Sequence, residues 1–265
     1  DASSTSLYGS RGANGVIIIQ TKQGKKGMPS IKYVGSVSMQ KTTRHMEMMD
    51  PYDYVVYQIE RNPLNFNRYL TDTGMTLDDY KSKEEVDWQS QLFRIAPMHT
   101  HNLSIYGGTD KTKYNISGNF ADQQGVVINS GHRKGGGRIS FTQDIGKRMK
   151  FTINANYHAD KISGLIASES LSSSNSFATY LMYRTWGSRP FYISDDASID
   201  DLFDEDSGTY SIMNPYISTQ NEYRVKKNQL FNVNGRVEIK LGKYTTLRIN
   251  GGYNSRESIS EVFNN

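Results

Sequence analysis

Apolar and polar residues alternate along seven stretches of this chain. Between residues 149 and 159, for example, the apolar Phe151 and Ile153 flank the polar Thr152. A period of two places alternate side chains on opposite faces of a β-strand. The alternation therefore predicts strands near residues 31–40, 99–108, 112–121, 134–145, 149–159, 228–241 and 244–254, each with one apolar and one polar face.

The connections between these strands differ in length. Short turns occupy residues 108–112, 146–149 and 242–244, whereas the connections at 41–98 and 160–227 are long. Short turns at one end and long loops at the other are typical of an outer-membrane β-barrel, with apolar side chains toward lipid and polar ones toward the lumen. Strands of this length match a tilted membrane crossing. A soluble β-sandwich with one wet face per sheet predicts the same alternation and stays an open alternative.

Seven strands do not close a bacterial barrel, because such barrels have even strand numbers. We therefore expect further strands beyond Asn265 if the barrel interpretation holds. The first residues read as the interior of a domain, so the sequence predicts a piece of a longer chain.

Two segments of the first long connection predict short helices at the mouth of the barrel. Residues 50–62 begin with Asp50 as a helix cap and Pro51 at the first helical position. Residues 82–94 begin with Ser82, followed by acidic residues in the expected first turn.

Composition narrows the function classes. The 265 residues are 36% hydrophobic and include 18 Tyr and 10 Phe, which makes a polar chain that is too aromatic for disorder. The net charge of +4 comes from 31 basic and 27 acidic residues spread along the chain, which argues against nucleic-acid binding. The absence of cysteine excludes disulfides and thiolate chemistry. No apolar run approaches a transmembrane helix, and no signal peptide is evident.

The opening stretch places glycines ahead of the apolar run 16–19. A dinucleotide-binding fingerprint needs a strand before its glycines and a helix after them. Here a strand is expected after the glycines and none before, so we interpret the stretch as a tight turn leading into a strand. The residues assigned to this structural turn are Gly9, Arg11, Gly12, Asn14 and Gly15.

No catalytic arrangement stands out, and we expect neither enzymatic activity nor a cofactor. An acidic cluster that includes Asp200, Asp201 and Asp204 offers the oxygen ligands that calcium prefers. The spacing of an EF-hand is missing, so a solvated loop is the favoured interpretation and no metal site is predicted. His99 and His101 lie two apart on one strand and are interpreted as strand-end polar residues rather than as a metal pair.

Several pieces of the chain resemble one family, in the same order. They are DASSTSLYGSRGANGVIIIQTKQGKKG (1–27), DPYDYV (50–55), VDWQSQLFRIA (86–96) and HNLSIYGGTDKTKYNISGNFADQQGVVINSGHRKGGGRISFTQDI (101–145). These resemble the end of the plug, the first loop and the early hairpins of SusC/RagA-type TonB-dependent outer-membrane transporters. The resemblance covers most of residues 1–157 and weakens through 160–227. The glycine-rich RKGGGR at 133–138 departs from the family pattern.

This resemblance implies an all-β fold, part of an antiparallel transmembrane barrel of about 22 strands with a plug in its lumen. Residues 1–27 would form the end of the plug and its linker, and 28–265 the first seven or so barrel strands. The implied function is TonB-dependent import of a large nutrient, a glycan or a peptide, across the bacterial outer membrane. The implied partners are a SusD-like surface lipoprotein, the TonB complex, the substrate and outer-membrane lipid, and a dimer of transporter–lipoprotein pairs is compatible with them. A soluble secreted β-sandwich that binds carbohydrate is the alternative.

One aromatic and basic cluster lies in the second long connection. Aromatic rings with polar tips suit the binding of sugars, so we expect this cluster to contact the substrate or the lipoprotein lid. Packing of the loop against the barrel wall or its neighbours is the competing interpretation and stays open. The cluster consists of Tyr180, Tyr183, Arg184, Trp186, Arg189, Phe191 and Tyr192.

Overall fold

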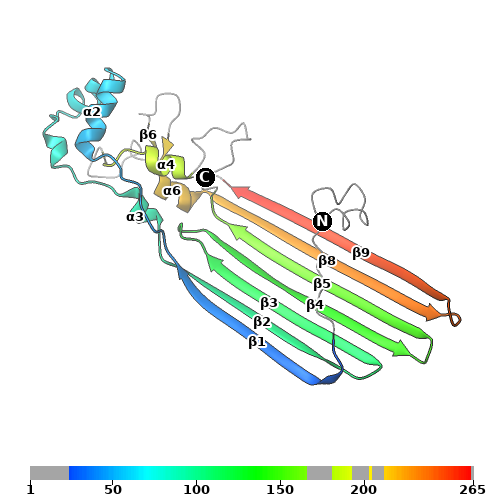
Figure 1. Ribbon diagram of the computed structural model, residues 1–265. Helices are drawn as coiled ribbons and strands as arrows, with labels where there is room; N and C mark the ends of the chain where they lie inside the picture. Colours follow the sequence, from blue (N-terminus) through cyan, green and yellow to red (C-terminus); the bar gives the residue numbers. More distant parts are fainter. Residues whose placement is uncertain (1–23, 166–180, 193–202, 205–211, 264–265) are drawn as a thin grey trace, which may run out of the picture.

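The computed structural model describes residues 24–165, 181–192, 203–204 and 212–263 (Figure 1). Its main feature is one sheet of seven long strands, in which every neighbouring pair is antiparallel. The strand order is β1-β2-β3-β4-β5-β8-β9, which follows the order of the sequence. The strands are β1 (Gly27–Gln40), β2 (Ala96–Gly108), β3 (Thr112–Gln124), β4 (Gly131–Ile145), β5 (Met149–Ser163), β8 (Tyr223–Lys240) and β9 (Thr246–Phe263).

The seven predicted strands are confirmed, and most are longer than the sequence indicated. β9, for example, extends nine residues past the predicted end at 254, because its pairing with β8 continues to Phe263. The predicted sixth strand ended one residue too late, at Leu241, and the predicted seventh strand began two residues too early, at Tyr244. The turn between them occupies those residues.

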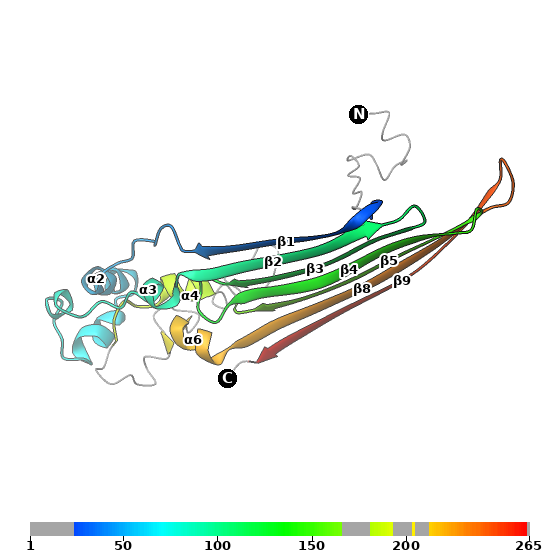
Figure 2. The same ribbon diagram turned by 90° about the horizontal axis from the view of Figure 1, so that it is seen from below.

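Helices gather at one end of the sheet and tight turns at the other (Figures 1 and 2). The sheet seen edge-on in Figure 2 extends away from the helical end as a single layer. A small pair of strands, β6 (Phe203–Asp204) and β7 (Ile212–Met213), forms a separate ladder. The helices are α2 (Pro51–Arg61), α3 (Trp88–Leu92), α4 (Leu181–Gly187) and α6 (Pro215–Asn221), with a π-helical turn at Asn67–Thr71 and a 3-10 turn at Asp79–Lys81. None of the helices in the described ranges has the length and apolar character to cross a bilayer.

The pairing register sorts side chains into two faces across the whole sheet. One apolar row crosses all seven strands at Ile31, Ile105, Ile116, Ile139, Ala155, Val233 and Tyr253. The next row along the strands is polar and consists of Lys32, Ser104, Ser117, Arg138, Asn156, Asn232 and Asn254. Successive residues of a strand point to opposite faces. The sheet therefore has one apolar face and one polar face.

The first helix follows the sequence prediction. The carboxylate of Asp50 caps α2 by accepting a hydrogen bond from the Asp53 N–H at 2.8 Å, and Pro51 occupies the first position. This arrangement satisfies a backbone donor that the helix itself leaves unpaired.

The second predicted helix is shorter than expected, and Ser82 does not start it. The Ser82 hydroxyl donates to the Asp79 carbonyl and so closes the preceding 3-10 turn. α3 begins only after Asp87, whose carboxylate accepts hydrogen bonds from the backbone N–H groups of Gln89 and Ser90. Asp87 is a better cap than Ser82 because its carboxylate accepts hydrogen bonds from two backbone N–H groups that the helix leaves unpaired.

The principal buried cluster lies in the loops rather than in the sheet. Tyr54, Val55, Tyr69 and Tyr80 come from the first long connection, and Phe191 comes from the second. The rings of Tyr80 and Phe191 lie 5.2 Å apart, and the Tyr80 hydroxyl donates to the Tyr69 carbonyl at 2.8 Å. The two long loops thus fold into one unit at the helical end of the sheet.

Candidate functional site

A pocket of about 460 Å³ lies between the two long loops. Its apolar wall combines three methionines of the first loop with aromatic side chains from both loops. Carboxylates and one guanidinium complete the lining. The residues that define this loop pocket are Met46, Met48, Met49, Tyr57, Arg61, Glu85, Asp87, Tyr183 and Trp186.

Two of the residues predicted to contact substrate or lid line this pocket. Tyr183 and Trp186 are each 42% exposed and come from α4. An aromatic ring with a polar tip at a half-exposed position can stack on an apolar ligand face and still donate a hydrogen bond. These two side chains are therefore open to a ligand.

Three other members of the predicted cluster contribute to packing. Phe191 is 1% exposed within the loop core. Arg189 is buried, and its carbonyl accepts a hydrogen bond of 2.8 Å from the indole N–H of Trp88. The Tyr192 ring meets the Trp88 ring edge-on, with 5.8 Å between their centroids. Tyr180 lies outside the described residues.

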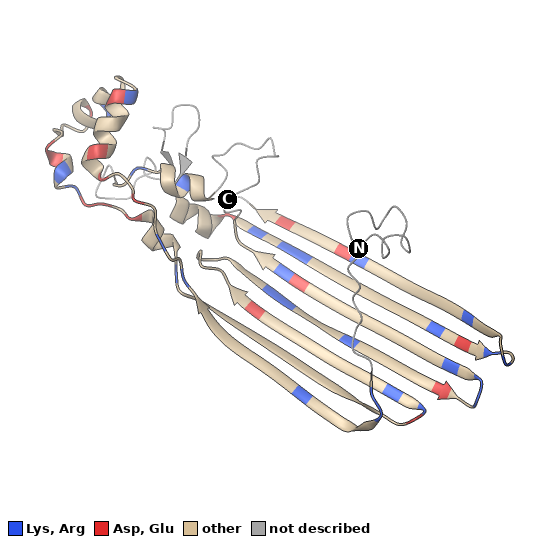
Figure 3. Cartoon of the chain, viewed as in Figure 1, with Lys and Arg blue, Asp and Glu red and all other residues tan. Residues whose placement is uncertain are grey.

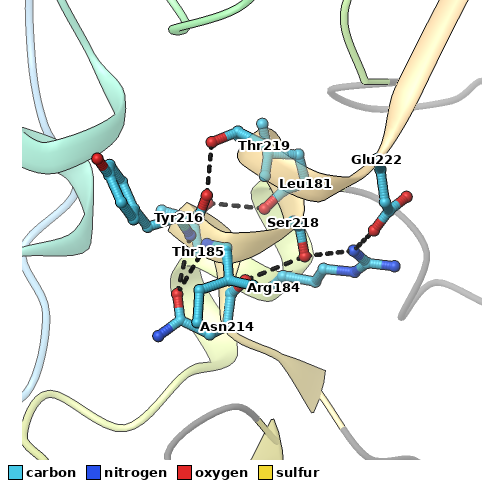
Figure 4. Close-up of polar contacts among 9 residues, drawn as sticks. Leu181, Arg184, Thr185, Asn214, Tyr216, Ser218, Thr219 and Glu222 are labelled. Carbon is cyan, nitrogen blue, oxygen red and sulfur yellow. Dashed lines mark hydrogen bonds and ion pairs between the residues drawn. The ribbon is translucent and has the colours of Figure 1, made fainter. Parts of the chain in front are cut away.

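Arg184 joins α4 to α6 in a polar network (Figure 4). One guanidinium nitrogen, Nη1, donates to the Ser218 hydroxyl at 2.6 Å and also to the Glu222 carboxylate. The Arg184 and Glu222 side chains are 11% and 6% exposed. The Asn214 side chain caps α6 by accepting from the N–H groups of Tyr216 and Ile217. The network fixes the helix that carries Tyr183 and Trp186.

Among the ionisable residues that line the loop pocket, Asp87 has a shifted pKa. Burial alone would raise the pKa of its carboxyl group, but hydrogen bonds from the Ser90 hydroxyl and from two backbone N–H groups more than offset burial. The pKa of Asp87 is consequently lowered, and the residue stays anionic in the wall of the pocket.

The methionines were missed by the sequence analysis. The run HMEMMD at residues 45–50 places three flexible, polarisable side chains beside a predicted helix. Such side chains adapt to irregular partners. The exposed methionines directly before the predicted helix start were the sequence signal that could have indicated this pocket.

Basic residues outnumber acidic ones along the strands (Figure 3), and the register places most of them on the polar face. In its half near the turns the basic residues are Lys32, Lys113, Lys150, Arg236, Lys240 and Arg248, and the acidic ones are Asp144 and Glu238. In its half near the loops the basic residues are Lys134, Arg138, Arg224, Lys226 and Arg256, and the acidic one among the described residues is Asp160.

Within the described strands, the apolar face carries charge only near the loop end, and this charge is balanced. Its basic residues are Arg133, Lys161 and Lys227, and its acidic ones are Asp122, Glu257 and Glu261. Arg133 pairs with Asp122 at 2.6 Å, and Lys227 pairs with Glu261 at 2.7 Å. The two faces therefore differ in net charge as well as in polarity.

The remaining predicted residues fall elsewhere. Gly9, Arg11, Gly12, Asn14 and Gly15, together with Asp200 and Asp201, lie outside the described residues, and of Asp204 only the backbone, in β6, is described. Within the described ranges, no group of three or more acidic or histidine side chains is placed to hold a metal ion. His101 shares a hydrogen bond of 2.6 Å with the Tyr33 hydroxyl.

Comparison with known proteins places these features in context. No family model matches the chain. The chain is 38% identical over 162 residues to the TonB-dependent receptor SusC of Bacteroides thetaiotaomicron, covering 59% of this chain and 15% of that receptor. It is 34% identical over 154 residues to the TonB-dependent receptor P3 of Formosa agariphila, covering 58% of this chain and 14% of that receptor. The chain thus spans about a seventh of the length of these relatives.

Solved structures share the fold over nearly the whole chain. The RagAB peptide importer in the "open-open" state aligns with a TM-score of 0.72 and 22% identity, covering 99% of this chain and 31% of that one. A second structure of the RagAB peptide transporter gives 0.69 and 19%, covering 97% and 31%. The matched relatives are named as receptors and importers rather than as enzymes. The chain is a homologue of SusC-type TonB-dependent receptors and has the all-β fold of the matching part of RagAB.

Proposed function

We propose that this chain is a section of a TonB-dependent outer-membrane transporter that imports a large nutrient, an oligosaccharide or a peptide. The observation that carries the proposal is the separation of an apolar and a polar face over all seven strands. A sheet of this kind meets lipid on one side and an aqueous lumen on the other when it closes into a barrel. The likeness to RagAB over almost the whole chain supports this arrangement.

Each part of the chain has a place in such a transporter. Residues 1–27 form the end of a plug and its linker, and residues 28–265 form barrel strands and their outward loops. The ion pair between Lys26 and Asp110, at 2.6 Å, supports a fixed junction, since it ties the segment before β1 to the turn between β2 and β3. The proposed location is the bacterial outer membrane, and the proposed energy source is the TonB complex.

The loop pocket is proposed to contact the substrate or a SusD-like surface lipoprotein. The pocket lies at the end of the sheet where the long loops gather, opposite the tight turns. Tyr183 and Trp186 are its half-exposed aromatic side chains from α4. Aromatic anchors beside flexible methionines are typical of surfaces that bind a partner.

This role predicts that Tyr183→Ala and Trp186→Ala, in the full-length receptor, lower uptake of its nutrient by about tenfold, the loss typical of an aromatic anchor. The amount of receptor in the outer membrane should be unchanged, because both side chains lie at the surface. Tyr244→Ala is the matched control, since Tyr244 is 89% exposed at the opposite end of the sheet. Normal uptake by both α4 variants would refute the role of the pocket.

Fractionation tests the wider proposal. The full-length protein should be recovered with the outer membrane and should require detergent for release. Recovery in the soluble periplasmic or extracellular fraction would refute the transporter and favour a secreted carbohydrate-binding β-sandwich instead.

A further inference from the structure

In the basic half of the polar face next to the loops, basic side chains outnumber acidic ones among the described residues. Lys134, Lys226 and Arg256 are exposed, and none of them forms an ion pair within the described ranges. The Nε atom of Arg224, in the same half, is buried without a hydrogen-bond partner. Like charges gathered on one wall create a positive potential that attracts anions.

The one carboxylate found in this half among the described residues is already engaged. Asp160 accepts a hydrogen bond from the Asn228 side chain at 2.9 Å, and both His132 and His158 approach it to 3.7 Å. Asp160 lies opposite Lys134 in the ladder, yet its oxygens contact these other side chains. It therefore leaves most of the positive charge of this half uncompensated.

The segment that precedes the sheet does not supply the missing negative charge either. Residues 1–23 contain one acidic residue, Asp1, and two basic ones, Arg11 and Lys22. Neither the described residues nor residues 1–23 therefore balance the positive charge of the basic half.

The neighbours of these cations indicate what kind of anion fits. The same rows of the polar face present amides and hydroxyls, among them Asn102, Asn119, Asn156, Asn232 and Thr100. Amide groups both donate and accept hydrogen bonds, which matches the hydroxyl groups of a sugar. Polar side chains outnumber apolar ones in these rows, where Val34, Met98, Ile162 and Leu230 are the larger apolar members, so the rows suit a sugar better than an apolar peptide.

We infer that the basic half of the polar face binds an acidic oligosaccharide, one that carries carboxylate or sulfate groups, on its way through the transporter. The inference rests on the proposed function, because it assigns the polar face to the transport path. The lysines and arginines neutralise the acidic groups, and the amides bind the hydroxyls between them.

Binding to the full-length receptor, purified in detergent, tests this inference. The probes are oligogalacturonate, a sulfated malto-oligosaccharide, a neutral malto-oligosaccharide and an oligoglutamate peptide, all of equal length. The two acidic oligosaccharides should bind at least about tenfold more tightly than the neutral one, and high salt should weaken that preference, since ions screen exposed charges. The first two probes distinguish carboxylate from sulfate as the recognised group.

A triple variant isolates the basic half. Lys134→Gln, Lys226→Gln and Arg256→Gln together should abolish the preference for acidic oligosaccharides. The matched control removes the same charge at the same end of the opposite face, with Arg133→Gln, Lys161→Gln and Lys227→Gln, and should keep the preference. This control separates a local effect from a change in net charge.

Three results would overturn the inference. They are equal affinity for neutral and acidic oligosaccharides, tighter binding of oligoglutamate than of either acidic sugar, and an equal loss of all probes together with lower receptor abundance in the Lys134, Lys226 and Arg256 variant. The last result would mean that these cations pair with another part of the protein. A receptor that sits in the outer membrane and imports a neutral glycan would retain the proposed function and lose only this inference.

Discussion

At the scale of single residues, the contact between Arg184 and Glu222 makes the clearest prediction. Both side chains are nearly buried, so removing one leaves the other as an unpaired charge away from water. Arg184→Ala should destabilise the packing of α4 on α6 by about 3 kcal/mol. Hydrogen exchange over residues 181–187 and 215–221 should accelerate accordingly.

The control for that prediction is an exposed ion pair. Lys81 and Asp78 lie 2.8 Å apart, with side chains 58% and 83% exposed. Such pairs contribute little to stability, so Lys81→Ala should leave exchange in the loops nearly unchanged. Comparable effects of the two substitutions would mean that the Arg184 network is not a structural link.

Asp87 makes a prediction about pH. Its pKa in the folded protein lies below 3.8, the ordinary value for an aspartate. The cap it provides is therefore fully present above about pH 4 and is lost as the pH falls through the lower, folded-state pKa. Hydrogen exchange of residues 88–92, corrected for its intrinsic pH dependence, should accelerate only in that acidic range.

Asp87→Asn should remove this pH dependence, because the amide still accepts a hydrogen bond but does not titrate in that range. An Asn variant that loosens α3 at the same acidic pH as the unsubstituted protein would contradict the assignment to Asp87.

At the scale of elements, α2 connects the loop core to the loop pocket. It contributes Tyr54 and Val55 to the core, and Tyr57 and Arg61 to the lining of the pocket. A weaker α2 should therefore disturb both features at once.

Removal of the cap of α2 tests this connection. Asp50→Ala should cost about 1 kcal/mol and speed hydrogen exchange in α2 by about fivefold, whereas Asp50→Asn should retain most of the cap. The result would argue against the capping role if the two variants behaved alike.

Elements with local signals were predictable from the sequence. The alternation in the strands and the Asp50–Pro51 helix start both depend on residues close together in the chain, and both are confirmed. The start of α3 was misplaced because Ser82 and Asp87 are both acceptable caps, and only the folded chain shows that Ser82 closes another turn.

Contacts between residues far apart in the chain could not be predicted from local sequence patterns. Phe191 packs on Tyr80, which lies more than a hundred residues earlier in the chain. The aromatic cluster in the sequence therefore did not reveal that Phe191 is a core residue rather than a ligand contact. The small net charge of +4 likewise gave no indication that basic residues gather on one face of the sheet. Only the register shows that Lys134, Lys226 and Arg256 share one side of the sheet.

At the scale of the whole molecule, the two faces of the sheet meet different surroundings in the proposed transporter. Outside the loop unit the sheet is a single layer, and the apolar side chains of β1 remain exposed, Val37 at 77% and Ile31 at 70%. An exposed apolar surface of this extent needs a cover. In the proposed barrel that cover is lipid, and the basic, amide-rich face lines the aqueous path.

Site-directed spin labelling along β5 of the full-length receptor in membranes tests this claim most directly, since the present chain has no cysteine of its own. Single cysteines are placed in turn at the six positions of residues 151–156, and the collision of each label with lipid-soluble oxygen and with a water-soluble nickel complex is measured. The account predicts strict alternation, with labels at Phe151, Ile153 and Ala155 accessible to oxygen and those at Thr152, Asn154 and Asn156 accessible to nickel. Equal access of the nickel complex to both sets would contradict a lipid-facing wall.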